Sequence, residues 1–249
     1  MSAKQLVKRI ARNFGVQIAR LPDGLPDVPD VDRRLIEFVR PYTMTSPERV
    51  FGLASATRWL VDSAIPGDVV ECGVWRGGSM MAVARTLLDA GAADRDLYLF
   101  DTFAGMTAPT AEDLDHRGRP AADRFAELAD GEQSSAWCRA GIADVRANLA
   151  LTGYPEHLLH FVPGMVEQTI PAGAPASIAL LRLDTDWYTS TRHELVHLWP
   201  RLVSGGVCII DDYGHWKGSR QAVDEYLAEQ GLKVLMHRLD YSGRLIIKP

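Results

Sequence analysis

The sequence has few cysteines, no long apolar run and no excess of positive charge, and each shortage excludes a class of protein. Its three cysteines are widely spaced, without a CxxC pair or a Cys/His ligand pattern, so we expect neither disulfides nor a zinc site. No stretch of about 18 apolar residues occurs, and the start lacks the features of a secretory signal. The formal charge of −5 gives no electrostatic drive toward nucleic acid. We therefore predict a cytoplasmic protein without nucleic-acid partner or stable membrane insertion.

Three sequence fingerprints of common enzyme classes are missing as well. There is no GxGxxG dinucleotide fingerprint and no GxxxxGK[ST] phosphate loop. There is also no GxSxG elbow to carry a nucleophilic serine. A nicotinamide oxidoreductase therefore remains only as an alternative, and covalent catalysis by serine is not expected.

The chain is long enough, at 249 residues with 47% hydrophobic content, for one large domain with a substantial core. Residues 1–32 differ in composition from the rest of the chain. Five basic residues and no acidic residue fall within 1–20, and apolar residues recur there at helical spacing, which predicts a basic amphipathic helix. Its partner is left open: a membrane surface, another protein or the domain itself. Three prolines and four aspartates predict a linker over 21–32, and a domain over 33–249.

The body of the chain alternates short apolar runs with helical segments. The predicted strands are Val69–Val74, Leu97–Phe100, His157–Val162, Ile178–Leu183 and Val207–Ile210. Helices between such strands indicate a parallel sheet that is covered on both faces, and so a doubly wound α/β fold. Two last runs, 233–239 and 244–247, are separated by a turn so short that they must pair antiparallel. The resulting seven-stranded, mostly parallel sheet with a C-terminal hairpin is typical of Rossmann-like class I methyltransferases. The polar segment 107–137 is predicted to be a lid insertion.

A glycine-rich turn follows the first predicted strand, where open α/β sheets bind ligands. Gly73 and Gly77 allow the backbone to turn sharply, and Glu71 is suited to a cationic amino group. At the end of the next strand, Asp101 can accept hydrogen bonds from ribose hydroxyls and Phe103 can cover an adenine. Such glycines are often purely structural, and a dinucleotide fold also has an acid at the second position. Together with the hairpin, however, these residues favour S-adenosylmethionine as cofactor.

Four aspartates follow two strands that we expect to be neighbours. They are Asp184, Asp186, Asp211 and Asp212. Two unit charges about 4 Å apart repel by roughly 4 kcal/mol at an effective dielectric constant near 20, so such a cluster needs protons, bases or a cation. Oxygen ligands favour Mg²⁺, Mn²⁺ or Ca²⁺ over zinc, and a carboxylate outside the metal shell can act as general base. The alternative is that one aspartate of each pair only caps a turn.

Other polar and aromatic residues near the strand ends allow more than one role. His215 follows the second aspartate pair closely and can orient an acceptor, take its proton or lie on the surface. Four aromatic residues can wall a sugar or aromatic acceptor, or pack in the core. They are Trp75, Trp187, Tyr188 and Trp216. Cys72 and Cys208 fall within strands and are predicted to be core residues.

Five motifs, in order and spacing, resemble the macrocin O-methyltransferase family over roughly residues 40–249. They are Tyr42-Thr43-Met44-Thr45, the segment Pro66–Ser79, Asp101–Gly105, Leu181–Asp186 and Ile209–Tyr213. The resemblance implies an S-adenosylmethionine-dependent, Mg²⁺-requiring sugar O-methyltransferase, often a dimer. It also implies residue roles. The metal ligands would be Asp184, Asp211 and Asp212, with Asp186 as general base. The cofactor contacts would be Glu71, Gly73, Ser79 and Asp101, with Thr43 and Thr45 near the methionine end.

The sequence departs from the family pattern at two positions around the first aspartate pair. Thr185 stands where the family commonly has glycine, and Trp187 stands where a less bulky residue is common. We therefore predict a homo-oligomeric, Mg²⁺-dependent O-methyltransferase that acts on a hydroxyl of a small-molecule acceptor, a glycosyl group or glycosylated natural product. Two alternatives remain beside the oxidoreductase: a catechol-type phenol O-methyltransferase and a non-catalytic metabolite-binding module.

Overall fold

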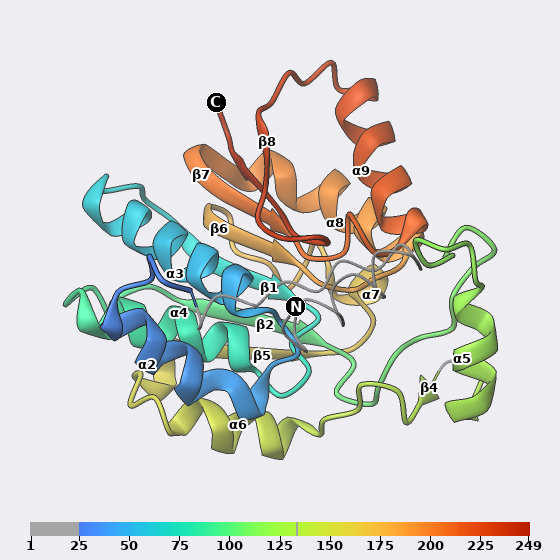
Figure 1. Cartoon of the computed structure of the whole chain (residues 1–249), viewed down its shortest axis with the longest axis horizontal. Helices are drawn as coiled ribbons and strands as arrows, with labels where there is room; N and C mark the ends of the chain where they lie inside the picture. The colour runs from blue at the N-terminus through green and yellow to red at the C-terminus, as the bar shows by residue number, and fades with distance from the viewer. Residues whose placement is uncertain (1–24, 133) are drawn as a thin grey trace, which may run out of the picture.

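The computed structural model describes residues 25–132 and 134–249, so the amphipathic helix predicted over 1–20 lies outside the described residues. The described chain forms a seven-stranded sheet between two layers of helices (Figure 1). In spatial order the strands are β5 (Leu159–Pro163), β2 (Leu97–Asp101), β1 (Asp68–Cys72), β6 (Ile178–Leu183), β7 (Leu202–Ile210), β9 (Arg244–Ile247) and β8 (Met236–Arg238). The first five are parallel, and β9 pairs antiparallel with both β7 and β8. The predicted fold class and C-terminal hairpin are confirmed.

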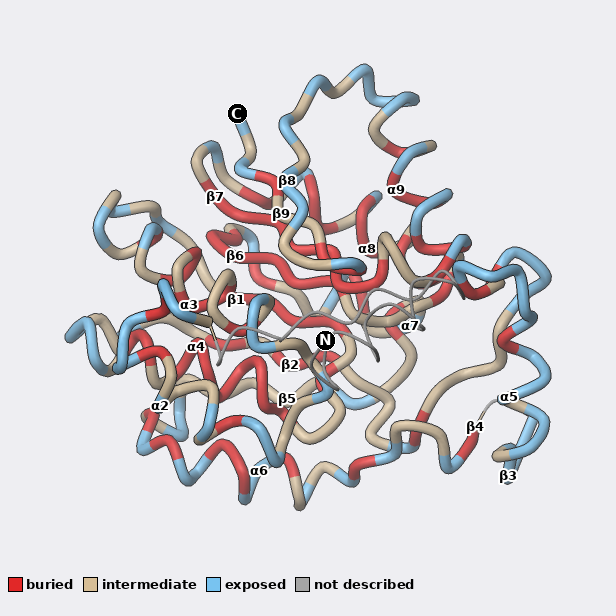
Figure 2. Tube along the Cα trace, viewed as in Figure 1, coloured by how far each residue is buried: buried red, intermediate tan, exposed pale blue. Residues whose placement is uncertain are grey.

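Helices cover both faces of the sheet, as predicted. On one face lie α2 (Asp30–Val39), α3 (Pro47–Asp62), α4 (Gly78–Asp89) and α6 (Ile142–Ala150). On the other lie α7 (Val166–Thr169), α8 (Tyr188–Leu198) and α9 (Lys217–Glu229). Short 3₁₀ turns are η1 (Arg40–Tyr42), η2 (Glu156–Leu158) and η3 (Trp199–Arg201). Successive strand residues point to opposite faces, so Val69 packs in one core and Val70 in the other. Figure 2 shows the strands buried between these layers.

Local sequence signals explain where α3 begins. Ser46 is its N-cap and its hydroxyl accepts a hydrogen bond from the amide of Arg49, while Pro47 takes the first helical position. The helix α2 begins at Asp30, within the segment predicted as a linker, and Asp32 forms a bidentate ion pair with Arg58 of α3. No helix of residues 25–132 and 134–249 combines the length and apolar character that a membrane crossing requires.

The segment 107–137 projects beyond the sheet at the right of Figure 1. It contains α5 (Ala121–Leu128) and a small antiparallel pair of β3 (Ala129–Gly131) and β4 (Ser134–Ser135), and is largely exposed (Figure 2). Two hydrogen bonds attach the first part of this segment to the rest of the domain. Asp113 accepts a hydrogen bond from the amide of Tyr188 at the start of α8, and the Trp187 indole donates to the carbonyl of Thr107.

Candidate active site

A cavity of about 350 Å³ opens at the carboxyl ends of the parallel strands. Most of the residues predicted from the sequence line it. They are Thr43, Thr45, Gly73, Ser79, Asp101, Asp184, Asp186, Asp211, Asp212 and His215. Glu71, Gly77 and Phe103 are not among the lining residues. The position agrees with the rule that open α/β sheets bind ligands beyond the carboxyl ends of their strands.

The turn after β1 requires glycine at Gly73. Its φ is +80°, and a Cβ atom there would run into the backbone carbonyl of Asp184. The close approach brings the turn against the strand end that carries the first aspartate pair. Gly77 serves the helix that follows, because at φ +84° it is the N-cap of α4, and a Cβ atom there would meet Leu149 instead of the cavity.

Asp101 joins the turns that follow β1 and β2. One carboxylate oxygen accepts hydrogen bonds from the amides of Val74 and Trp75, at 2.8 and 3.1 Å, and the other accepts from Phe103 at 2.7 Å. The Thr102 hydroxyl lies 3.5 Å from the carboxylate, but its one proton is donated to the carbonyl of Gly105 at 2.7 Å. Because a carboxylate offers about four acceptor positions, about one is left for a ribose hydroxyl. Phe103, which was expected to cover an adenine, contributes its amide here while its ring packs near Phe161.

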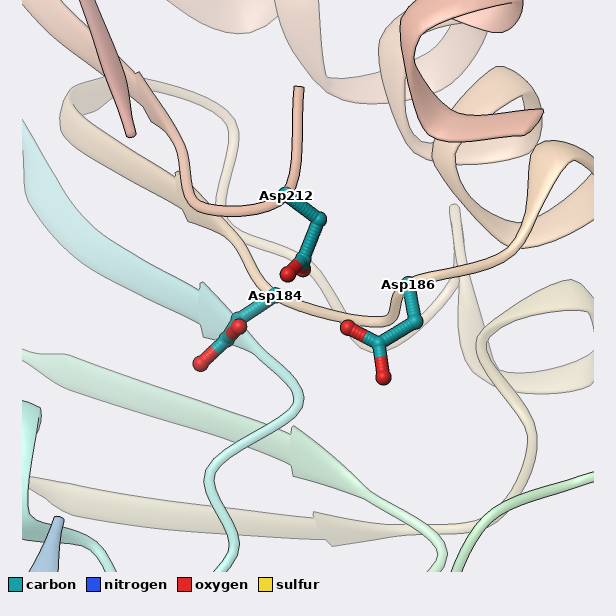
Figure 3. A group of neighbouring side chains, drawn as sticks. All are labelled: Asp184, Asp186 and Asp212. Carbon is teal, nitrogen blue, oxygen red and sulfur yellow. The ribbon is translucent and has the colours of Figure 1, made fainter. Parts of the chain in front are cut away.

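The sheet register explains why the aspartates meet. Leu183 and Ile210, the last residues of β6 and β7, are register partners, and Asp184 and Asp211 follow them directly. The carboxyl groups of Asp184, Asp186 and Asp212 surround a common space, with ligand oxygens within 4.8 Å of one another (Figure 3). Asp211 does not belong to this group. The structure therefore brings together three of the four predicted aspartates.

Burial raises the pKa of all three grouped carboxyls. The pKa of Asp186 rises to about 7, and the negative charges of Asp184 and Asp211 act in the same direction as burial. Burial also raises the pKa of Asp184, although the positive charge of Arg182 acts to lower it. Burial raises the pKa of Asp212 in the same way, although the positive charge of Arg49 acts to lower it. Asp186 itself has φ +68°, a left-handed conformation that is uncommon for a non-glycine residue.

Two arginines pair with acidic residues of the site, Asp184 among them. Arg182 of β6, whose side chain is 3% exposed, donates to Glu71, Asp184 and Asp211. Arg49 of α3 pairs with Asp211 and with Asp240 of the hairpin turn. Glu71 therefore faces a buried guanidinium, and burial raises its pKa to about 7.

The residues at this site fit a divalent cation. Among the described residues, six carboxyl groups share only two guanidinium groups here: those of Asp184, Asp186, Asp211, Asp212, Glu71 and Asp240. One oxygen of Asp212, Oδ2, is buried and has no hydrogen-bond partner within residues 25–132 and 134–249. Ligand oxygens on one Mg²⁺, at about 2.1 Å each, lie at most about 4.2 Å apart, so only a small closure of the three-carboxylate group is needed. The all-oxygen donor set suits Mg²⁺, Mn²⁺ or Ca²⁺.

The cavity rim is aromatic. The rings of Trp137 and Trp216, which line the cavity, lie 6.1 Å apart edge to face, and Trp187 packs behind both. His215 lies on the rim, where its Nδ1 is 3.2 Å from the Tyr241 hydroxyl. Burial lowers the pKa of His215, and the neighbouring His116 adds to this effect. Of the four aromatic residues suggested by the sequence, only Trp75 and Trp216 reach the cavity.

The sequence reasoning missed several residues of the site. Arg182 could have been identified from the sequence, because a single charged residue within an otherwise apolar strand needs a buried partner. Three other residues could not have been identified from the sequence, because they reach the cavity from segments that are distant along the chain. They are Arg49, Trp137 and Cys138. Burial raises the pKa of Cys138 to about 12, and nearby aspartates act in the same direction, so its thiol is neutral. Cys72 and Cys208 are buried in β1 and β7, as predicted.

Comparison with known proteins decides the family. A family model described as macrocin O-methyltransferase matches residues 33–247. The chain belongs to this family. It is therefore an S-adenosylmethionine-dependent O-methyltransferase, as predicted, and neither a nicotinamide oxidoreductase nor a non-catalytic module.

Individual O-methyltransferases are similar along most of the chain. The 8-demethyl-8-(2,3-dimethoxy-alpha-L-rhamnosyl)-tetracenomycin-C 4′-O-methyltransferase of Streptomyces olivaceus is 31% identical, over 96% of this chain and 89% of that protein. The mycinamicin III 3″-O-methyltransferase of Micromonospora griseorubida is also 31% identical, over 81% and 76%. Among solved structures, the O-methyltransferase NovP superposes with a TM-score of 0.73 at 26% identity, covering 83% of this chain and 82% of that chain.

Proposed function

We propose that this chain transfers the methyl group of S-adenosylmethionine to a hydroxyl oxygen on a glycosyl unit of a small-molecule natural product, in a reaction that requires Mg²⁺. The observation that carries the proposal is that one cavity holds both the turn at Gly73 and the three-carboxylate group. A methyl donor on the turn and a cation among the carboxylates would share one small volume. The name of the tetracenomycin relative, which specifies a rhamnosyl-bearing compound, supports a glycosyl acceptor.

The donor would lie over the turn after β1. Gly73 provides the close approach, Ser79 lies in the first turn of α4, and Asp101 keeps an acceptor position for a ribose hydroxyl. Thr43 and Thr45 line the same cavity from the segment before α3. Glu71 and Gly77, which do not line the cavity, would support this site through Arg182 and through the start of α4.

The cation would be held by Asp184 and Asp212, which both belong to the three-carboxylate group. Asp211 also lines the cavity, and each carboxylate oxygen has two acceptor positions, so its bonds to arginines leave it capacity for the cation. When bound, Mg²⁺ supplies Lewis acidity that lowers the pKa of the acceptor hydroxyl.

Asp186 would take the proton of that hydroxyl. The acceptor oxygen forms a bond to the methyl carbon, the carbon–sulfur bond breaks, and its electron pair remains on sulfur as S-adenosylhomocysteine forms. The proton passes to the carboxylate of Asp186, which lies within the three-carboxylate group. His215 would orient the acceptor from the rim through its contact with Tyr241.

The acceptor would enter over the aromatic rim. Trp137 ends the segment 107–137, which we propose acts as the lid, and its ring packs edge to face against Trp216, which also lines the cavity. Aromatic faces of this kind pack against the apolar face of a sugar ring. The unpaired cysteines support a reducing compartment such as the cytoplasm, and the family resemblance supports a homo-oligomer, which light scattering would test.

A substitution of the proposed base tests the reaction chemistry. Asp186→Asn should lower kcat by roughly 10²- to 10⁴-fold, the usual contribution of a general base, and leave binding of S-adenosylhomocysteine unchanged. Asp89→Asn is the matched control, since Asp89 pairs with Arg85 on an exposed helix face. Unchanged methyl transfer by Asp186→Asn would contradict the assignment.

A panel of acceptors tests the substrate class. Glycosides of natural products and simple catechols would be compared by following the formation of S-adenosylhomocysteine. Turnover of glycosides is expected. Turnover confined to catechols would contradict the glycosyl acceptor and favour the catechol-type alternative.

A further inference from the structure

Arg182 is the single charged residue of the buried strand β6, one residue before its carboxyl end, between the donor turn and the aspartates. Its side chain is 3% exposed, and every residue of β6 is buried. Nη1 donates to Glu71 of β1 and to Asp184, at 2.6 Å from the latter. Nη2 donates to Asp211 and to the hydroxyl of Thr45, at 3.0 Å from the latter.

These bonds join the ends of three neighbouring strands and the segment before α3. A guanidinium is planar and its donors have fixed directions, so it can hold several acceptors in one arrangement. The carboxylates of Asp184 and Asp211 are tied to the same group although they follow different strands. A Lys ammonium at this position would keep the charge but lose the fork that spans these partners.

We propose that Arg182 is a positioning residue of the cation site: it sets the orientation of Asp184, which belongs to the three-carboxylate group, and of Asp211, which lines the same cavity, before the cation arrives. The inference rests on the proposed Mg²⁺ site. Residues that orient metal ligands from outside typically change metal affinity by about 10- to 100-fold when replaced.

The sign of the effect separates positioning from simple electrostatics. Removing a positive charge beside a cation site should strengthen cation binding if only the Coulomb interaction matters. Removing a group that orients the ligands should weaken it. Arg182→Met therefore gives opposite results under the two accounts, and Arg182→Lys keeps the charge while losing the geometry.

The test is a titration of the full chain with Mn²⁺, followed by electron paramagnetic resonance of the free ion, with thermal unfolding measured in parallel. We expect Arg182→Lys and Arg182→Met to weaken Mn²⁺ binding by about 10- to 100-fold. Thr45→Val, which keeps the shape and removes one acceptor of Nη2, should weaken it by a smaller factor, and Thr45→Ser should restore it. Arg58→Lys is the matched control, because Arg58 forms a bidentate pair with buried Asp32 on the far side of α3 from the site.

Each of the following results would contradict a specific part of the proposal. Arg182 variants that lose thermal stability but bind Mn²⁺ as tightly as the unaltered chain, or more tightly, overturn the positioning role. Equal weakening by Arg58→Lys also overturns it, because the effect would then be general. If the Arg182 variants do not fold, unchanged Mn²⁺ affinity in Thr45→Val overturns it. Absence of Mn²⁺ binding by the unaltered chain instead overturns the cation site itself.

Discussion

Replacing Gly73 by alanine should damage the active site far more than its conformational strain alone can explain. Gly73 and Gly91 both have φ in the left-handed region, at +80° and +66°. A Cβ atom at Gly91 would have no heavy atom of the described residues within 4 Å, whereas a Cβ atom at Gly73 would overlap the backbone carbonyl oxygen of Asp184. Gly91→Ala therefore measures the strain alone, and Gly73→Ala measures the strain together with the displacement of Asp184.

The strain of a left-handed alanine is about 1–2 kcal/mol. In a chain of this size, each kcal/mol lowers Tm by about 2–4 °C, so Gly91→Ala should lower Tm by a few degrees and keep full activity. Gly73→Ala must also move the Asp184 carbonyl by roughly 1 Å, and misplacement of reacting groups on that scale costs about 10²-fold in rate. We expect Gly73→Ala to lower Tm further, to lower kcat by about 10²-fold and to weaken donor binding.

The measurements are thermal unfolding, steady-state kinetics of methyl transfer and calorimetric titration with S-adenosylhomocysteine. The comparison removes the contribution that both glycines share. If Gly73→Ala matched Gly91→Ala in turnover and in donor affinity, the close approach of the turn to Asp184 would have no functional consequence, and the geometry on which the site depends would be refuted.

Three further predictions concern the cation, the acceptor and pH. Dialysis against EDTA should abolish turnover, and Mg²⁺ or Mn²⁺ should restore it; full activity after chelation would remove the cation from the mechanism. Trp216→Ala should raise KM for the acceptor while the donor affinity stays constant, as measured by kinetics and calorimetry; equal losses for both ligands would place Trp216 elsewhere. Because the pKa of Asp186 is raised to about 7, the metal-free folded chain retains a proton that the unfolded chain releases near pH 4. Its free energy of unfolding should therefore fall as the pH rises from about 4 to about 7, and fall less in Asp186→Asn, in urea denaturation with EDTA; identical pH dependence would contradict the shift.

The alternation of apolar strands and helices was enough to predict the sheet, because parallel strands buried on both faces read as continuous apolar runs. The hairpin of β8 and β9 followed from the shortness of the turn between two apolar runs. The helix α5 was not predicted from the sequence, because its apolar residues Ala121, Phe125 and Leu128 recur over only eight residues within a polar, largely exposed segment.

The sequence by itself determined that acidic side chains gather at one edge of the sheet, since the carboxyl ends of neighbouring parallel strands lie together whatever the side chains do. Only the tertiary structure decided which partner each carboxylate faces. Asp211 and Glu71 pair with arginines of α3 and β6, Asp186 and Asp212 face each other, and Asp184 both faces them and pairs with Arg182. The direction of a carboxylate depends on which partner the fold brings within hydrogen-bond distance, and here those partners are as many as 162 residues away along the chain.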